Sequence, residues 1–436
     1  MADKFMSMQN LKFTLGSRQS RFREGDILNG HTPKTMDMVF KAALDIGVKV
    51  MHPMFEEMDK NPPCLENGRV KVHAGVRPML ALLGQDGWIS ATFPEQWDGE
   101  DMPASLLHCI NFIFATANYS ASVYAGLTIG AATATPFKEG IYKIVGEKIF
   151  ISAGDHDGAD NVVHLMLARI DGAKPGVRGI SLFAVPKFRE EAGDTVFNDV
   201  IVTQVFHKLG YRGAPITGLK FGEKDDCLGY LVGDPHKGLS YMFQMMNNAR
   251  LEVGMGATAI ATAAYNSALE YARTRCQGRA VTAAKDSDPV PIIQHSDVRR
   301  MLLFQRAVTE GSLALILHCG MYEDIYSKDP EQKDCHLLLE LLTPVAKTYP
   351  SEMGVFSTSA AIQCFGGYGY CDDFPVEQHF RDMRIHPIHE GTTGIQAMDL
   401  LGRKLGAFPF SRLYRWHWIV HVCHLLQAVP TPCFIK

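Results

Sequence analysis

The spacing of the apolar residues changes twice along this chain, and no other feature constrains its fold as strongly. Up to about residue 132 apolar side chains recur at helical spacing; from Thr135 they alternate, and from Gly238 the spacing is helical again. A period of 3.6 residues suits one face of a helix, whereas a period of 2 suits one face of a strand. The pattern predicts a mainly α protein with a small β domain: an N-terminal helical domain at 1–132, a middle β domain at 133–236, a C-terminal helical bundle at 237–404 and a tail at 405–436.

Three helices are expected in the first domain. Thr32 and Pro33 are a suitable start for a helix whose apolar residues recur through Met36–Gly47, and Val76–Leu83 is a second amphipathic helix. Ala104–Leu127 is predicted to be one long helix, apolar on nearly all sides. Such a helix is normally buried.

The middle segment has strand periodicity. Ile141–Ser152 is predicted to be a hairpin with its turn at Gly146. Further strands are expected at Val162–Arg169, Ile180–Val185 and Ile216–Phe221. Pro and Gly between them indicate a small β domain.

The third segment is rich in small residues at helical spacing. Ala249–Arg275 contains many alanines, which allow neighbouring helices to approach closely. Met301–Tyr326 and Cys335–Tyr349 are two further expected helices, so the segment is predicted to be a helical bundle. The same features also fit an ordinary bundle core without a ligand.

Composition narrows the possible functions. The 436 residues are 46% hydrophobic and 21% charged, as in globular proteins, and the net charge of −4 provides no basic field for nucleic acid. The 10 cysteines show no C-x-x-C pair or metal-ligand spacing, so we expect reduced thiols and no metal. No apolar run reaches the ~20 residues of a spanning helix, and the first residues lack a targeting pattern. We therefore expect a cytoplasmic protein without a transmembrane segment.

One segment near the end of the bundle has the residue types of a catalytic site. Glu390 is a lone carboxylate followed at once by Gly391 and by the hydroxyls of Thr392 and Thr393. This order suits a base beside a bound cofactor. Upstream, the glycines within residues 363–370 would let a dinucleotide approach the main chain, although glycine clusters commonly mark turns as well.

The order of these motifs resembles the C-terminal signature of the acyl-CoA dehydrogenase family. Q-x-x-G-G-x-G-Y at 363–370 is followed by Arg381-Asp382 and then by E-G-T at 390–392, and the resemblance extends over about residues 40–404. The Arg-Asp pair alone would be an ordinary solvated charge pair. Residues 149–157, 174–181 and 208–213 look like the branch that includes the methylmercaptopropionyl-CoA dehydrogenases.

The resemblance implies FAD-dependent α,β-dehydrogenation of an acyl-CoA thioester to the 2-enoyl-CoA. Side chains can supply a base for the α-proton, but a flavin must accept the β-hydride. In the family the residue matching Glu390 is the base, and its backbone N–H helps to hold the thioester oxygen. Arg250, Asn247 and Gly391 are assigned to the substrate side. Arg250 could equally be an ordinary charged residue at a helix start.

The resemblance also implies which residues bind FAD: Phe150, Ile151, Ser152, Arg275, Gln363, Gly366, Gly367, Thr392 and Thr393. Ser152 could instead be a polar strand end. Arg275 and the 363–367 loop match residues that reach the FAD of a neighbouring subunit, so a homodimer or homotetramer is implied. The implied electron acceptor is an electron-transferring flavoprotein or a similar protein.

The chain departs from the family in two places. A Thr-Glu-Pro-x-x-Gly-Ser-type loop, which binds the flavin's pyrimidine edge in relatives, is absent between Leu127 and Pro136. We expect weaker flavin binding and an unpaired edge in the β domain. After Lys404, the tail at 405–436 holds Trp416 and Trp418; it either lies on a membrane surface or is a poorly specified end.

Two alternative functions remain open at this stage. The first is a flavin-poor, catalytically impaired homologue that binds acyl-CoA or pairs with another subunit; a visible flavin spectrum on the purified protein would argue against it. The second is an acyl-CoA oxidase, which would produce hydrogen peroxide. The acyl chain length cannot be predicted because the pocket is built from residues far apart in sequence.

Overall fold

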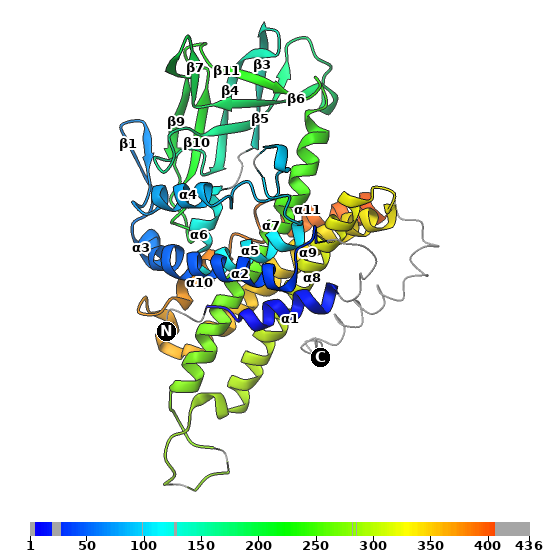
Figure 1. Ribbon diagram of the computed structural model, residues 1–436. Coiled ribbons are helices and arrows are strands. Elements are labelled where there is room, and N and C mark those ends of the chain that lie inside the picture. Colours follow the sequence, from blue (N-terminus) through cyan, green and yellow to red (C-terminus); the bar gives the residue numbers. More distant parts are fainter. Residues whose placement is uncertain are drawn as a thin grey trace.

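The structure is a computed structural model that describes residues 5–19, 28–97, 99–125, 129–280, 282–284 and 286–405. Its strands gather at one end and its helices at the other, and the long helix α7 (Gly238–Thr274) runs from the sheet through the helical part (Figure 1). The sequence prediction of a mainly α fold with a β domain between two helical regions is confirmed. The Leu127 and Thr128 side of the missing loop and the tail from 406 onward lie outside the described residues.

The first helical region contains the predicted helices, and one of them is shorter than expected. Its longer elements are α1 (Met8–Gln19), α2 (Pro33–Ile46), α3 (Phe55–Lys60), α4 (Val76–Gln85), α5 (Ala104–Ala117) and α6 (Tyr119–Ser122). The prediction of a single helix over Ala104–Leu127 was wrong. Asn118 is extended, and its side chain accepts the N–H of Ala121 to cap α6, so the chain restarts there instead of continuing.

A small hairpin that the sequence did not predict joins α3 to α4. It consists of β1 (Cys64–Glu66) and β2 (Arg69–Lys71). The buried Asp155, which follows β4, accepts the N–H of Val70 at 3.0 Å and pairs with Lys187 at 2.5 Å. These contacts join the first region to the β domain.

The β domain is built around five strands that close on one another. The strands of its main sheet are β3 (Ile129–Lys138), β4 (Ile141–Ser152), β5 (Val163–Ile170), β6 (Ile180–Pro186), β9 (Val200–Val205), β10 (Ile216–Phe221) and β11 (Leu228–Val232). Their order is β11-β6-β5-β3-β4-β10-β9, and β11 also pairs with β4. This additional pairing closes β11, β6, β5, β3 and β4 into a ring around a core that includes Ile144 and Phe183.

The predicted hairpin with its turn at Gly146 was wrong. β4 runs through Gly146, which pairs with Phe221 of β10. The turn lies instead at Gly140, where φ is +70° and glycine avoids the strain of a side chain. β3 before this turn and β4 after it form the hairpin.

The expected unpaired edge is present beside β3 and β4. β3 pairs with β4 only as far as Thr133 opposite Val145, while Ile129–Ala134 pairs in parallel with β5. In the ladders of the described residues, Gly146–Lys148 and Ile151 therefore pair with β10 and not with β3. β3 pairs with β5 through its first part and with β4 through its second part. In a chain with the complete loop these two parts would be separate strands, so a single β3 agrees with the loss of the loop between them.

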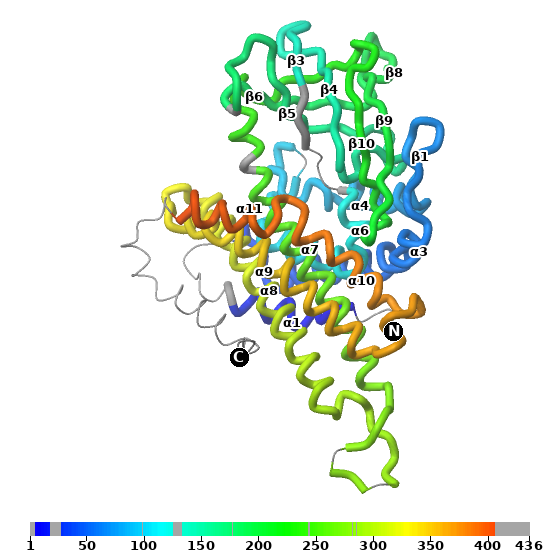
Figure 2. The backbone as a smooth tube through the Cα atoms, turned by 180° about the vertical axis from the view of Figure 1, so that it is seen from behind, coloured from blue at the N-terminus to red at the C-terminus, as the bar shows by residue number. Residues whose placement is uncertain are grey.

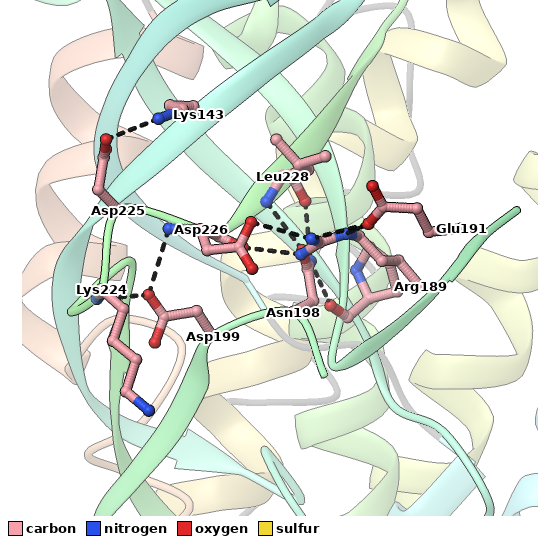
Figure 3. A network of polar contacts seen from close by, with 10 residues as sticks. Lys143, Arg189, Glu191, Asn198, Asp199, Lys224, Asp225, Asp226 and Leu228 are labelled. Carbon is pink, nitrogen blue, oxygen red and sulfur yellow. Dashed lines mark hydrogen bonds and ion pairs between the residues drawn. The ribbon is translucent and has the colours of Figure 1, made fainter. Parts of the chain in front are cut away.

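A polar network holds the far end of the β domain together. Arg189 of β7 (Phe188–Glu191) donates to the Asn198 side chain at 2.8 Å and to the Asp226 carbonyl at 2.7 Å, and Asn198 bonds both backbone groups of Leu228 (Figure 3). Arg189 is buried and its charge is balanced by Glu191 and Asp226. The short hairpin of β7 with β8 (Asp194–Phe197) is thereby fixed to the β10–β11 connection.

The third region is a bundle of three long helices and two short ones. These are α7, α8 (Ser296–Lys328), α9 (Lys333–Phe365), α10 (Val376–Met383) and α11 (Thr393–Met398), with the π-helix η8 (Asp399–Lys404) after α11. α11 packs on α9 (Figure 2). The prediction that a helix ends at Tyr349 was wrong, because α9 continues through Pro350.

Helices α7 and α9 approach each other closely beside Pro350. Proline has no N–H to donate, so the carbonyl of Ala346 loses its usual partner four residues on. Gly254 of α7 packs against this carbonyl, and a Cβ at Gly254 would lie 2.1 Å from it. The small residues predicted to allow close helix packing have this effect here.

The structure also bears on the membrane and cysteine predictions. Among the helices of the described residues, none has both the length and the apolar character needed to cross a bilayer. The described cysteines have free thiols, and the described residues contain no cluster of metal-ligating side chains. The domain limits at 132/133 and 236/237 stay predictions; the first falls within β3.

Candidate active site

Glu390 lies on a turn between α10 and α11 whose backbone is held in an uncommon conformation. Both Glu390 and Gly391 have positive φ, +52° and +90°. Left-handed backbone is unfavourable for a non-glycine residue and persists only where the surroundings hold it. The buried Gln396 provides this support, since its Nε2 donates to the Glu390 carbonyl at 3.0 Å and to the Gly391 carbonyl at 3.3 Å.

The electrostatic surroundings of Glu390 suit a base. Its side chain is exposed to solvent, yet protein atoms crowd it closely enough that desolvation raises its pKa above the ordinary glutamate value. The positive charges of Arg250 and Lys347 oppose this rise. A carboxylate with a raised pKa is a stronger base than one in water.

The predicted substrate-side residues on α7 are held by an ion-pair network. Arg250 is buried and pairs with Asp399 at 2.8 Å, and Asn247 donates to Glu340 of α9. Lys404 joins the two acids, at 3.8 Å from Asp399 and 3.1 Å from Glu340. Arg250 therefore forms its ion pair with Asp399, and it influences Glu390 only through its positive charge.

Replacing the central acid of this network is expected to destabilise the protein. In Asp399→Asn, Arg250 would be left buried without its charge partner, which typically costs about 3–5 kcal/mol. Arg403→Gln is the matched control, because Arg403 is the exposed partner of the same acid, and its loss should cost about 0–1 kcal/mol. Denaturant unfolding of both variants measures the difference. Equal stability of the two would contradict a structural role for the Arg250–Asp399 pair.

The two threonines after Glu390 begin α11. The Thr392 carbonyl accepts the N–H of Gln396 at 3.0 Å, so Thr392 starts the helix through its backbone. The Thr393 hydroxyl donates to Glu352 of α9. Of the two hydroxyls proposed to face the cofactor, that of Thr393 already has a protein partner.

Three of the residues assigned to FAD, Phe150, Ile151 and Ser152, lie at the end of β4 and are proposed to contact the flavin ring. Phe150 is 66% exposed and has a φ of +60°, and its ring lies 4.7 Å from that of Phe206. Ile151 is buried in the core of the β domain. Ser152 ends the strand opposite Ile216 of β10.

The other residues assigned to FAD meet at the far end of the bundle. Arg275 follows the last residue of α7, Gln363 lies in the last turn of α9, and Gly366 and Gly367 come directly after that helix. Stacking of Tyr271 on Phe365, with ring centroids 4.2 Å apart, joins the two helix ends. Arg275 and Gln363 are exposed. A Cβ at Gly366 or Gly367 would meet no atom within 4 Å, so backbone there is open to a ligand.

These residues are far from Glu390 within one subunit. Arg250 and Arg275 are 25 residues apart along α7, and a helix rises about 1.5 Å per residue, so roughly 37 Å separates them. An extended dinucleotide does not reach that far. The sequence-predicted residues of the helical bundle thus form two groups, one around Glu390 and one around Arg275, while Phe150, Ile151 and Ser152 lie in the β domain.

Sequence reasoning missed Lys347, Gln396 and His386. Lys347 is fully buried on α9 and donates to the His386 carbonyl at 2.7 Å. The His386 ring lies 4.8 Å from Tyr119 and 5.3 Å from His389. Gln396 could have been found from the sequence, because it lies only six residues after Glu390, close enough for its side chain to reach the same turn. Lys347 gave none, because it belongs to a different helix.

Comparison with known proteins agrees with this architecture. Residues 236–405 match the family described as acyl-CoA dehydrogenase, C-terminal domain. The chain is 38% identical over 389 residues to 3-methylmercaptopropionyl-CoA dehydrogenase of Ruegeria pomeroyi. The aligned region covers 78% of this chain and 66% of that protein. The chain belongs to the acyl-CoA dehydrogenase family. The Ruegeria relative also carries the name of the branch that the sequence motifs indicated.

Two further relatives describe the extent of the likeness. A butyryl-CoA dehydrogenase of Syntrophomonas wolfei is 38% identical over 323 residues, covering 71% of this chain and 52% of that protein. The structure of butyryl-CoA dehydrogenase from Megasphaera elsdenii has the acyl-CoA dehydrogenase fold seen here, with a TM-score of 0.68 at 20% identity, over 86% of this chain and 99% of that one. The chain spans only about half to two thirds of the two curated relatives.

Proposed function

We propose that this chain catalyses the FAD-dependent α,β-dehydrogenation of an acyl-CoA thioester to the 2-enoyl-CoA. The observation that carries the proposal is Glu390: a carboxylate on a left-handed turn, with its pKa raised by desolvation, in a chain of the acyl-CoA dehydrogenase family. Bound FAD would supply the acceptor for the β-hydride. Glu390 would remove the α-proton.

The residues present fit FAD at both of its ends, with fewer partners at the ring end. Arg275 offers a charged, exposed guanidinium, and the open backbone at Gly366 and Gly367 would accommodate phosphate groups. At the ring end, the exposed Phe150 at the end of β4 provides an accessible apolar face. The absent loop removes the hydrogen-bond donors that relatives place there.

The backbone of Glu390 and two residues of α7 would form the substrate side of the site. The backbone N–H of Glu390, with Gly391 after it, would donate to the thioester oxygen, which gains negative charge as the α-proton leaves. Arg250, fixed by Asp399, would keep a positive charge near Glu390 and favour its carboxylate form. Asn247, tied to Glu340, would line the same side of α7.

The separation of the two residue groups supports an oligomer. Arg275, Gln363, Gly366 and Gly367 would contact the FAD of a neighbouring subunit, which makes a homodimer or homotetramer part of the proposal. An electron-transferring flavoprotein or a similar protein would reoxidise the flavin. Roles in fatty acid metabolism and a cytoplasmic location stay predictions.

Arg275→Ala is expected to lower FAD occupancy and weaken subunit association together. The guanidinium is proposed to bind phosphate across the interface, where charge-assisted bonds are strong. Bound flavin per subunit and sedimentation measure the two effects. Arg273→Ala is a matched control, because Arg273 is also exposed at the same helix end. Unchanged flavin content and sedimentation in Arg275→Ala would make Arg275 an ordinary surface residue.

The proposed reaction is tested by supplying FAD and screening acyl-CoAs of different length with an artificial electron acceptor. Appearance of 2-enoyl-CoA supports the proposal. The missing loop favours one alternative, a flavin-poor acyl-CoA-binding homologue. Acyl-CoA binding by calorimetry without any product at saturating FAD would favour that alternative, and acceptor-independent hydrogen peroxide would indicate an oxidase.

A further inference from the structure

Lys347 is a buried cation that has no ion pair among the described residues. Its side chain is fully buried on α9, and the carboxylates that act on it through their charge are those of Glu352 and Glu390. The Lys347 Nζ donates a hydrogen bond to the His386 carbonyl at 2.7 Å. Burying an ammonium group is costly, so its retention calls for a role that an apolar residue could not fill.

The packing of the helices fixes Lys347 in this place. Gly254 of α7 packs against the carbonyl of Ala346, the residue before Lys347, and brings α7 and α9 together. Gly256, also on α7, leaves room for the rings of Tyr119 and His386, because a Cβ there would lie 2.4 Å from Tyr119 and 3.0 Å from His386. The ammonium group is thus directed at the turn that follows α10.

That turn carries Glu390. After the His386 carbonyl, backbone bonds from Ile388 and His389 to Ile385 continue the turn, and Glu390 then adopts its left-handed conformation. Gln396 holds the turn from the α11 side and Lys347 from the α9 side. Losing either contact would release one side of a strained backbone.

Charges around the turn come from each element packed on it. Lys347 and Glu352 lie on α9, Arg250 on α7 and Tyr119 on α6, while His386 and His389 belong to the turn itself. Burial lowers the pKa of His389 to about 4 and that of His386 well below its ordinary value, so both rings are neutral at pH 7. The cations that act on Glu390 are then Arg250 and Lys347.

We propose that Lys347 is a positioning residue for Glu390: its ammonium group holds the His386 carbonyl and thereby the turn, and its positive charge favours the carboxylate form of the base. The inference rests on the proposed function only for its catalytic consequence. The hold on the turn and the charge effect are properties of the protein alone. Removal of the charge should raise the pKa of Glu390, since the opposing influence of a cation is lost.

Three substitutions separate the two parts of this role. Lys347→Met removes charge and donor at similar length, Lys347→Gln keeps a donor without charge, and Lys347→Arg keeps both. The carboxyl infrared band of Glu390, assigned by difference from the same variant carrying Glu390→Gln, reports its titration without turnover. Hydrogen exchange of residues 386–391 reports the hold on the turn.

In Lys347→Met we expect the Glu390 titration to move up by about one pH unit, the scale of one nearby charge, and exchange of residues 386–391 to become faster. In Lys347→Gln the titration should move equally while exchange changes less; Lys347→Arg should restore both.

If Lys347→Met does not fold, the titration and exchange of Lys347→Gln are compared with those of Lys347→Arg to test the proposal. Unchanged titration and exchange in folded Lys347→Gln would overturn the proposal, whereas absence of dehydrogenation in the unmodified protein would count against the proposed function alone.

Discussion

Glu390→Gln is expected to abolish α-proton removal while acyl-CoA binding remains nearly intact. The amide has almost the same shape as the carboxylate but cannot accept a proton at neutral pH. A positioned general base typically contributes about 10²–10⁴-fold to the rate, so turnover should fall by at least that factor. Single-turnover dehydrogenation with FAD supplied measures the loss, and calorimetry with acyl-CoA measures binding.

One control variant and one contradicting outcome define this result. Glu352→Gln changes a nearby carboxylate, the acceptor of the Thr393 hydroxyl, and should lower turnover far less. Near-normal turnover in Glu390→Gln would show that another group removes the proton. The Gln substitution also keeps the size of the side chain on the left-handed turn, so the backbone held by Gln396 should be preserved.

The pH dependence follows from the same residue. Desolvation by the surrounding protein atoms raises the pKa of Glu390, and the positive charges of Arg250 and Lys347 oppose this rise. Because the ionised form is the base, kcat/KM should rise with pH through a pKa above the ordinary value of about 4.3 and level off above it. A profile in which kcat/KM falls as pH rises through this range would contradict Glu390 as the base.

The second large effect concerns the cofactor: this chain is expected to bind FAD more weakly than a relative with the complete loop and to be isolated largely as apoprotein. Each neutral hydrogen bond lost at a buried flavin edge should cost about 0.5–1.5 kcal/mol. Loss of three would lower affinity by roughly 10–1,000-fold. The part of β4 directly after Val145, with which β3 does not pair, is the structural counterpart of this loss.

Bound FAD per subunit in the purified protein and titration of the remainder by calorimetry test the expectation. Inserting the Thr-Glu-Pro-x-x-Gly-Ser-type loop of a relative between Ala132 and Thr133 is the complementary experiment, and it should increase affinity. Stoichiometric, tight FAD in the unmodified chain would show that other residues replace the loop.

Local pattern was sufficient for much of the fold. The change in apolar period placed the β domain between two helical regions, and E-G-T after Arg381-Asp382 singled out Glu390. The prediction from local pattern failed where contacts with residues far along the chain overrode a local signal. Gly146 looked like a turn, but pairing with Phe221 keeps it in a strand; the helix expected to end at Tyr349 continues through Pro350 as α9, which packs closely on Gly254 of α7.

The sequence by itself determined the family, the residue types of the candidate site and the absence of the flavin loop, since each is written in contiguous residues. Tertiary structure alone decided that Arg250 is paired with Asp399, that Lys347 holds the turn of Glu390, and that the Arg275 group lies roughly 37 Å along α7 from Arg250. Such facts depend on contacts between residues far apart in the chain. Packing of whole helices sets them, and no local spacing encodes that packing.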